Sequence, residues 1–309
     1  MSTFESRNKK TELIEKLIKF SLIIAATISI LTTFGILFSI LFESIEFFKL
    51  RSFWYFLTGI EWSPGIVGSK FGALPIFAGT FVITIIALAV AIPVGLGSAI
   101  YMSEYATPKT RDYLKPLLEI LAGIPTVVYG FFAAITVAPL IVEAAEIFGL
   151  EATFNSALAS GVVMGIMIIP VISSLSDDVI KAVPDSQRKA AFGLGMTHGE
   201  TIKNIVLPSA LPGIISASLL GLSKALGETM IVVMAAGLRP NLSWNPLEDM
   251  TTVTVTIVNS LVGDFEFNSP ETLSAFALGL VLFVITLILN MISLSLIRKF
   301  KEKYKVNTL

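Results

Sequence analysis

Apolar residues in this sequence gather into long runs that contain no charged side chain. A membrane-spanning helix needs about 20 consecutive, mostly apolar residues, and five uncharged runs reach that length. A sixth run is equally apolar but carries two charged residues near its middle. The pattern therefore predicts an all-α protein with six transmembrane helices, at residues 20–42, 71–103, 120–142, 152–176, 213–237 and 272–297.

Prolines interrupt two of these runs. The run at 71–103 is longer than a bilayer requires and holds Pro75 and Pro93, so part of it is expected to be kinked or interfacial. Pro125 lies near the start of the run at 120–142, where it frees backbone carbonyls that only protein or a water-filled cavity can satisfy. Pro125 therefore predicts either a simple kink or a break that lines a polar pathway.

Lys224 and Glu228 are the two charged residues inside the fifth run. Nine Leu, Ile and Val residues there favour membrane insertion by about 0.3–0.6 kcal/mol each, whereas one charge near a helix centre opposes it by roughly 2.5–3.5 kcal/mol. An ionisable residue at this depth indicates a functional site. Residues four apart share a helix face, so the pair is expected to lie within reach of an ion pair near the middle of the membrane.

One face of the same run carries only small residues. Glycine or alanine recurs every four positions at Gly213, Ala217, Gly221 and Ala225. Small residues let helix backbones approach closely in a membrane. This face is therefore expected to pack against a neighbouring helix.

Composition supports the membrane assignment and excludes several kinds of chemistry. The 309 residues are 54% hydrophobic and only 15% charged, with a mean hydropathy of +0.82, against about 25% charged residues in soluble proteins. The absence of cysteine excludes disulfides, thiolate catalysis and cysteine-based metal sites. The single histidine, His198, cannot form a metal site alone and is expected at the surface. The sequence predicts no cofactor and no metal.

Basic residues predict the orientation, because cytoplasmic loops of membrane proteins are rich in Lys and Arg. Alternate connections hold seventeen such residues on one side and four on the other. Both termini are therefore expected in the cytoplasm. The first run exceeds the about 7–15 apolar residues of a signal peptide and is expected to remain as an anchor. The cytoplasmic segments are 1–19, 104–119, 177–212 and 298–309.

The connection at 177–212 is long and has its own helix signals. Asp185 or Ser186 can cap a first short helix that ends at Gly195. Thr197 and Glu200 form a capping box for a second helix, which Pro208 is expected to limit. Long loops often serve a function, and a helix presented in this way can dock in the groove of a partner.

The same connection resembles the EAA loop of ABC-importer permeases, whose pattern is E-A-A-x3-G-x9-I-x-L-P. The matching residues are Lys189, Ala190, Ala191, Gly195, Ile205, Leu207 and Pro208. The spacing agrees throughout, and the departure is Lys189 where the motif usually has Glu. The resemblance implies that these residues couple the protein to a cytoplasmic ATPase. The chain lacks the G-x-x-x-x-G-K-[ST] phosphate loop, so it is not itself expected to be an ATPase.

Further motifs narrow the resemblance to the PstC-type permeases of phosphate ABC importers. They are the runs "LLEILAGIPTVVYGFF" and "GLSKALGETMIVVMAAG", together with the Trp62-x-Pro64 segment and the final "FALGLVLFVITLILN". This resemblance implies the six-helix, MetI-like fold of type I importers. Residues 1–19 would form a cytoplasmic segment, and 20–309 a permease domain that includes the coupling loop at 177–212.

The resemblance also implies a substrate and partners. The substrate is inorganic phosphate, and the protein would form half of a pathway in the prokaryotic plasma membrane. Its partners would be a second permease of the PstA type, two ATPase subunits of the PstB type and an extracytoplasmic phosphate-binding protein. Nucleic acid is not an expected partner.

Several pathway residues follow from the matching motifs: Lys224, Glu228, Thr229, Pro125 and Thr126. The family carries Arg and Glu at the positions of Lys224 and Glu228, where they are implicated in phosphate passage. Lys keeps the charge but loses the planar fork that holds phosphate with two bonds, so a weak, transient anion site is expected. The alternatives are a purely structural ion pair, a permease for molybdate, sulfate or phosphonate, and an ion-coupled secondary transporter.

Overall fold

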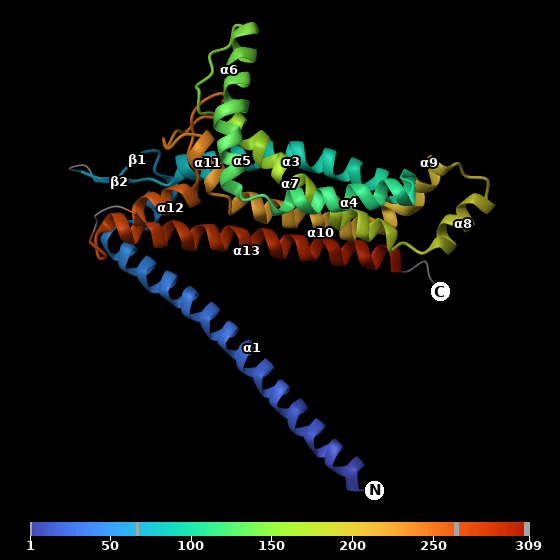
Figure 1. Ribbon diagram of the computed structural model, residues 1–309. Coiled ribbons are helices and arrows are strands. Elements are labelled where there is room, and N and C mark those ends of the chain that lie inside the picture. Colours follow the sequence, from blue (N-terminus) through green and yellow to red (C-terminus); the bar gives the residue numbers. More distant parts are fainter. Residues whose placement is uncertain (1, 66–67, 263–265, 306–309) are drawn as a thin grey trace.

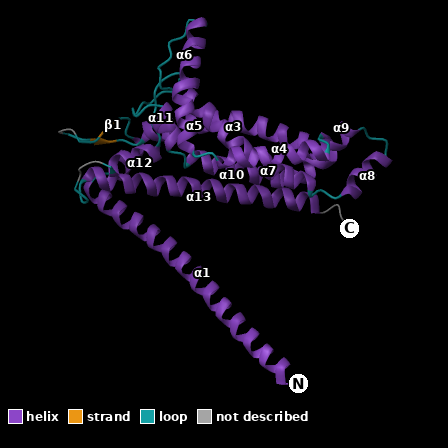
Figure 2. Cartoon of the chain, viewed as in Figure 1, coloured by secondary structure: helices purple, strands orange, loops and turns teal. Residues whose placement is uncertain are grey.

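The computed structural model describes residues 2–65, 68–262 and 266–305. Within these ranges the chain is almost entirely helical (Figures 1 and 2). Two short strands, β1 (Trp62–Ser63) and β2 (Lys70–Phe71), pair antiparallel. The helices are α1 (Ser2–Leu50), α2 (Phe53–Thr58), α3 (Leu74–Ile100), α4 (Pro108–Gly123), α5 (Thr126–Phe132), α6 (Ala138–Ile147), α7 (Ala157–Lys181), α8 (Asp185–Gly193), α9 (His198–Thr201), α10 (Leu207–Leu226), α11 (Met230–Ala235), α12 (Val253–Leu261) and α13 (Pro270–Lys305), with π-helical segments η1 (Tyr101–Tyr105), η2 (Ala133–Val137) and η3 (Ile202–Val206).

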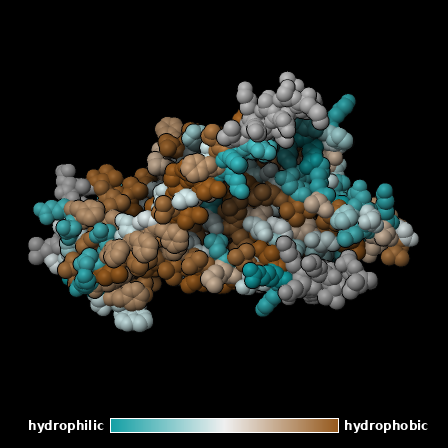
Figure 3. All heavy atoms as spheres, turned by 90° about the horizontal axis from the view of Figure 1, so that it is seen from below, coloured by the Kyte–Doolittle hydropathy of each residue, from teal (hydrophilic) through white to brown (hydrophobic). Residues whose placement is uncertain are grey.

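Six continuous helical stretches are long and apolar enough to cross a membrane, which confirms the predicted number. Apolar residues also cover much of the surface shown in Figure 3, whereas hydrophilic residues are more frequent toward the end that holds α8 and α9. The protein is thus a multi-pass membrane protein. The stretches are Ile14–Leu50, Leu74–Tyr105, Thr126–Ile147, Ala157–Lys181, His198–Leu226 and Pro270–Lys299.

Close helix packing forms the centre of the bundle, where α3, α7 and α10 run side by side (Figure 1). A Cβ atom added at Gly161 of α7 would lie 2.7 Å from Ile86 of α3, so no larger residue fits without displacement. The predicted small-residue face of α10 packs on α7 in the same way. A Cβ added at Gly221 would come within 3.0 Å of Ile168 and Ile172. This confirms the close packing expected from the sequence.

The third span is shorter at its start than the sequence suggests. The uncharged run at 120–142 predicted one helix with an interruption at Pro125, and the structure places a full break there. Residues 120–123 belong to a separate helix, α4, which packs along α7 (Figure 1). The sequence assigned residues 104–119 to a loop, but their basic residues lie in the helix α4. Pro125 lacks the N–H that would continue the ladder, so α5 starts directly after it.

The fifth span also differs from its prediction. It begins at His198, well before residue 213, and ends at Leu226 rather than at 237. The sequence predicted that Pro208 limits the second helix, and this prediction was wrong because the helical stretch continues through it. The π-helical turn η3 precedes it, and Pro208 falls in the first turn of α10, where a missing N–H is tolerated. The turn η2 precedes Pro139 of α6 in the same manner.

An aromatic cluster closes the opposite end of the bundle from α8. Phe47, Phe56, Trp62 and Phe71 are almost fully buried and meet edge to face, with ring centroids 5.3–6.3 Å apart. Trp62 and Phe71 are also directly paired across β1 and β2. The cluster holds the start of α3 in place, since Ala73 donates its N–H to Phe56 O.

Helix α1 leaves the bundle at an angle and is exposed along most of its length (Figure 1). Among its described side chains, only Ser44 and Phe47 are buried, and both lie near its C-terminal end. Its exposed residues are mainly Ile, Leu and Phe. Such a surface is stable in lipid or against another apolar surface, but not in water.

Candidate functional site

A break separates α10 from α11, where the sequence predicted a continuous helix. The chain leaves helical geometry at Gly227, Glu228 and Thr229, and α11 starts at Met230. Non-helical backbone at membrane depth occurs only where it is buried in protein or lines a water-filled cavity. This segment is therefore the strongest structural candidate for a functional site within the bundle.

Glu228 holds this break in its observed shape. The side chain is 8% exposed, and Oε1 accepts the backbone N–H groups of Met230 at 3.0 Å and Ile231 at 3.3 Å. The Glu228 carbonyl accepts the Thr254 hydroxyl at 2.8 Å, which ties the break to α12. A carboxylate is favourable here because the first N–H groups of a helix have no partner within the helix.

The expected ion pair between Lys224 and Glu228 is not formed, so that prediction was wrong. Residues four apart share a face only while the helix continues, and α10 ends two residues after Lys224. Lys224 is half-buried, and the described residues provide no hydrogen bond or ion pair for its ammonium group. An ammonium group in this state can take an anionic ligand without first losing a protein partner.

Pro125 and Thr126 form the second break and lie at the start of α5. This helix packs against α11: a Cβ added at Gly130 would lie 3.1 Å from the Met230 carbonyl oxygen. The structure thus brings together the two helices that follow the two predicted pathway motifs. Thr126 and Thr229 are both half-buried, and within the described residues neither is hydrogen-bonded to Lys224.

Ion pairs between α4 and α7 were missed by sequence reasoning. The guanidinium of Arg111 donates to Asp177 Oδ2 at 2.5 Å, and Lys115 Nζ donates to Asp178 Oδ1 at 2.7 Å. Asp177 is fully buried. The sequence does contain two cations four residues apart and two adjacent acids, but only the fold shows that these residues meet.

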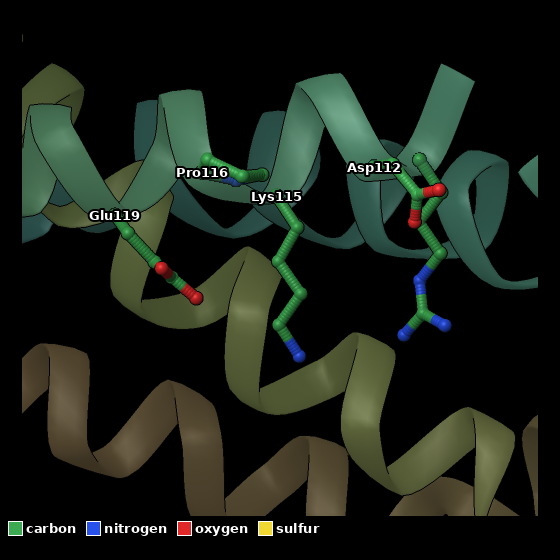
Figure 4. Close-up of a pocket in the computed structure, with 5 residues that line it drawn as sticks. Asp112, Lys115, Pro116 and Glu119 are labelled. Carbon is green, nitrogen blue, oxygen red and sulfur yellow. The ribbon is translucent and has the colours of Figure 1, made fainter. Parts of the chain in front are cut away.

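A surface pocket of about 300 Å³ lies beside these pairs, and Lys115 points from α4 toward the neighbouring helix (Figure 4). Its lining also contains Asp112 and Glu119. With both cations already paired to aspartates, the pocket has no excess positive charge. It is therefore unsuited to bind a free anion.

The coupling loop has the predicted helix, turn and helix. Helix α8 ends at Gly193, and the turn places Gly195 at φ +84°, the left-handed region that favours glycine. Gly195 donates its N–H to Phe192 O, and Met196 donates to Ala191 O, which closes the end of α8. The capping box of Thr197 and Glu200 is confirmed.

The residues of the EAA-like motif occupy different positions on this loop. Lys189 and Ala190 are exposed on α8, whereas Ala191 is buried. Ile205 lies in η3 and is half-buried, as are Leu207 and Pro208 at the start of α10. Phe192 and Leu194 are 45% and 85% exposed beside the motif. The loop thus presents a mixed basic and apolar surface.

Comparison with known protein families identifies the chain. Residues 91–303 match the family described as binding-protein-dependent transport system inner membrane component. The chain belongs to this family. Members are permease components, so this protein is a permease subunit of an ABC importer and not itself an ATPase. Such an importer works with separate ATPase and binding-protein partners. Family membership also rules out the ion-coupled secondary transporter.

The matches between this permease and its curated relatives cover about three quarters or more of each chain. It is 36% identical to the phosphate transport system permease protein PstC of Mesorhizobium japonicum, over 76% of this chain and 75% of the relative. It is 33% identical to PstC 1 of Mycobacterium tuberculosis, over 79% and 82%. It is 35% identical to the probable ABC transporter permease protein YqgH of Bacillus subtilis, over 81% and 78%.

Solved structures confirm the fold of the permease. The methionine ABC transporter MetNI in its inward-facing form aligns with a TM-score of 0.52 at 16% identity, covering 74% of this chain and 94% of that one. A bacterial ABC transporter involved in the import of the acidic polysaccharide alginate aligns with a TM-score of 0.56 at 14% identity, covering 86% and 96%. The expected MetI-like fold is thereby confirmed.

Proposed function

We propose that this permease subunit imports inorganic phosphate and forms half of the translocation pathway. The observation that carries the proposal is Lys224, which is half-buried, has no ionic or hydrogen-bond partner among the described residues and lies beside the break at Gly227–Thr229. The relatives named as PstC add support for phosphate as the anion.

Lys224 would attract phosphate as a point charge at the end of α10. Glu228 would keep the break open and, through its own negative charge, limit the affinity so that the anion is released. Thr229, Pro125 and Thr126 would line the two breaks, with hydroxyl groups and free carbonyls replacing water around the anion. A weak site suits transport, because a tightly bound ion would not leave.

The partners proposed are a PstA-type permease, two PstB-type ATPase subunits and an extracytoplasmic phosphate-binding protein. The loaded binding protein would dock at the end that holds the aromatic cluster. ATP-driven closure of the ATPase subunits would move the coupling loop at the other end and reorient the helices. The separation of these two features at opposite ends of the bundle supports this arrangement (Figure 1).

Uptake of radioactive phosphate by cells or proteoliposomes containing the full importer tests the substrate. Uptake is expected to require ATP and to be reduced by unlabelled phosphate, but not by equal concentrations of sulfate, molybdate or phosphonate. Stronger competition by one of these oxyanions than by phosphate would assign the permease to that substrate instead.

We also propose that the coupling loop faces the cytoplasm, as the seventeen-to-four distribution of basic residues predicts. Cysteines introduced as Ser186→Cys and Trp244→Cys occupy exposed positions at the two ends of the bundle. In intact cells, an impermeant thiol reagent is expected to label the Trp244 site and leave the Ser186 site unmodified. The native chain has no cysteine to add background. Labelling of Ser186→Cys from outside would contradict the proposed orientation and place the loop on the outer side. The predicted cytoplasmic C-terminus at Leu309 lies outside the described residues.

A further inference from the structure

Arg188 on α8 is bonded to two separate segments of the chain, η1 and the stretch from Ile180 to Asp185. Its Nη2 donates to Glu104 Oε1 at 2.8 Å and to the Ile180 carbonyl at 2.9 Å. Its Nη1 donates to the Val183 carbonyl and, at 3.3 Å, to Asp185 Oδ1. The guanidinium therefore satisfies carbonyls at the end of α7 while it pairs with a carboxylate from η1. Only a planar fork with several donors can make this set of bonds at once.

Glu104 is the partner that connects this arginine to the rest of the bundle. Its side chain is 5% exposed and that of Arg188 is 15% exposed, so the pair is shielded from water. The main-chain oxygen of Glu104 also lies 3.2 Å from His198 Nε2, at the start of α9. His198 packs edge-on against Tyr105 and stacks with Phe192. One residue of η1 thus contacts both halves of the coupling loop.

The segment that carries Glu104 continues directly into α3. The stretch Leu74–Tyr105 has 32 residues, which corresponds to about 48 Å of helix at roughly 1.5 Å per residue. It runs from the coupling loop to the aromatic cluster at the opposite end. A displacement of α8 can therefore be passed to the far end of the bundle through the joint at Glu104, beside the apolar cluster that includes Ala99, Ile180 and Val183.

We infer that the Arg188–Glu104 pair is the joint that makes α3 follow the coupling loop. Arg188 is a positioning residue: it fixes the direction of α8 relative to α3 through bonds whose geometry apolar packing does not reproduce. The inference rests on the proposed docking of the coupling loop to an ATPase, but not on phosphate as the substrate.

The test compares the native pair with an apolar replacement. Arg188→Gln alone would leave a buried carboxylate without a partner and can destabilise the protein, whereas replacing both members of a buried pair by apolar residues is often neutral for stability. The double variant Glu104→Met with Arg188→Met is therefore decisive, and its thermal stability is compared with that of the native importer. Asp185→Asn is the matched control, because Asp185 is 82% exposed and its loss leaves the Arg188–Glu104 bond intact.

The main readout is a distance measured by spin labels in the full importer. Labels at Ser186→Cys on α8 and Val94→Cys on α3 report whether the two helices move together, and both positions are exposed. With a non-hydrolysable ATP analogue, the distance is expected to stay constant in the native background and in the control. In the double variant it is expected to shift, with a roughly tenfold loss of ATP-driven uptake.

An unchanged distance and normal uptake in the stable double variant would overturn the inference. A shift of the same size in the native background would also overturn it, since α3 would then not follow α8. Because the analogue acts through the ATPase alone, either result is independent of phosphate specificity. Failure of the phosphate proposal would instead appear in the competition experiment, with the distances unaffected.

Discussion

Replacing Lys224 with glutamine is expected to reduce ATP-driven phosphate uptake by roughly tenfold or more, while the importer still assembles. Hydrogen bonds to charged groups contribute about 1.5–3 kcal/mol, and Gln is a polar side chain one atom shorter than Lys that lacks the positive charge. Lys224 has no bond to another described side chain, so its replacement breaks no internal ion pair. Lys224→Arg should retain transport, because it preserves the charge.

The measurement is the initial rate of phosphate uptake at matched amounts of assembled importer. Lys109→Gln is the matched control: it removes the charge of an exposed lysine at the start of α4, away from the break. If Lys224→Gln transports at the native rate, Lys224 is not part of the anion site. Loss of assembly rather than of transport would assign it a structural role.

Gly195→Val is expected to prevent stable association with the ATPase subunits and to abolish transport. The backbone at Gly195 has φ +84°, and a β-branched residue held in such a region costs about 1–3 kcal/mol. An added Cβ would meet nothing within 4 Å, so the effect comes from the backbone conformation and not from a clash. The turn between α8 and α9 would change shape, and the exposed face of α8 would be presented differently.

Gly195→Asn separates an effect of the backbone conformation from an effect of the added side chain, because asparagine tolerates the left-handed region better than most residues do. It should largely retain ATPase association, which is measured by co-purification from membranes. Both variants are expected to insert in the membrane as the native chain does. Equal loss in Gly195→Asn and Gly195→Val would contradict the role of the backbone, and normal uptake by Gly195→Val would contradict the role assigned to the turn.

Local rules predicted part of this structure well. The six spans follow from the lengths of apolar runs, because a bilayer admits few other arrangements of such a chain. The break at Pro125 and the capping box at Thr197 follow from single residues with strong local preferences. The turn at Gly195 belongs to the same group.

Other features depend on contacts between distant segments. No proline marks the end of α10, and the break at Glu228 is held by bonds to α11 and to Thr254. Pro208 has a strong tendency to end a helix, but the π-helical turn before it accommodates the ring. Arg111 finds its partner 66 residues away in Asp177. Such bonds cannot be read from spacing along the chain.

The uninterrupted helix from His198 to Leu226 has a mechanical consequence. Its 29 residues form a rod of about 43 Å, at roughly 1.5 Å per residue. The α9 end of the coupling loop and Lys224 therefore lie on one continuous helix, so a push or a twist at α9 is passed along the chain toward Lys224, with η3 and Pro212 as the positions where the helix can bend. A full break at Pro208 would have separated the two ends. The register along this rod matters as well: one residue inserted within α10 would turn Lys224 by about 100° relative to α9.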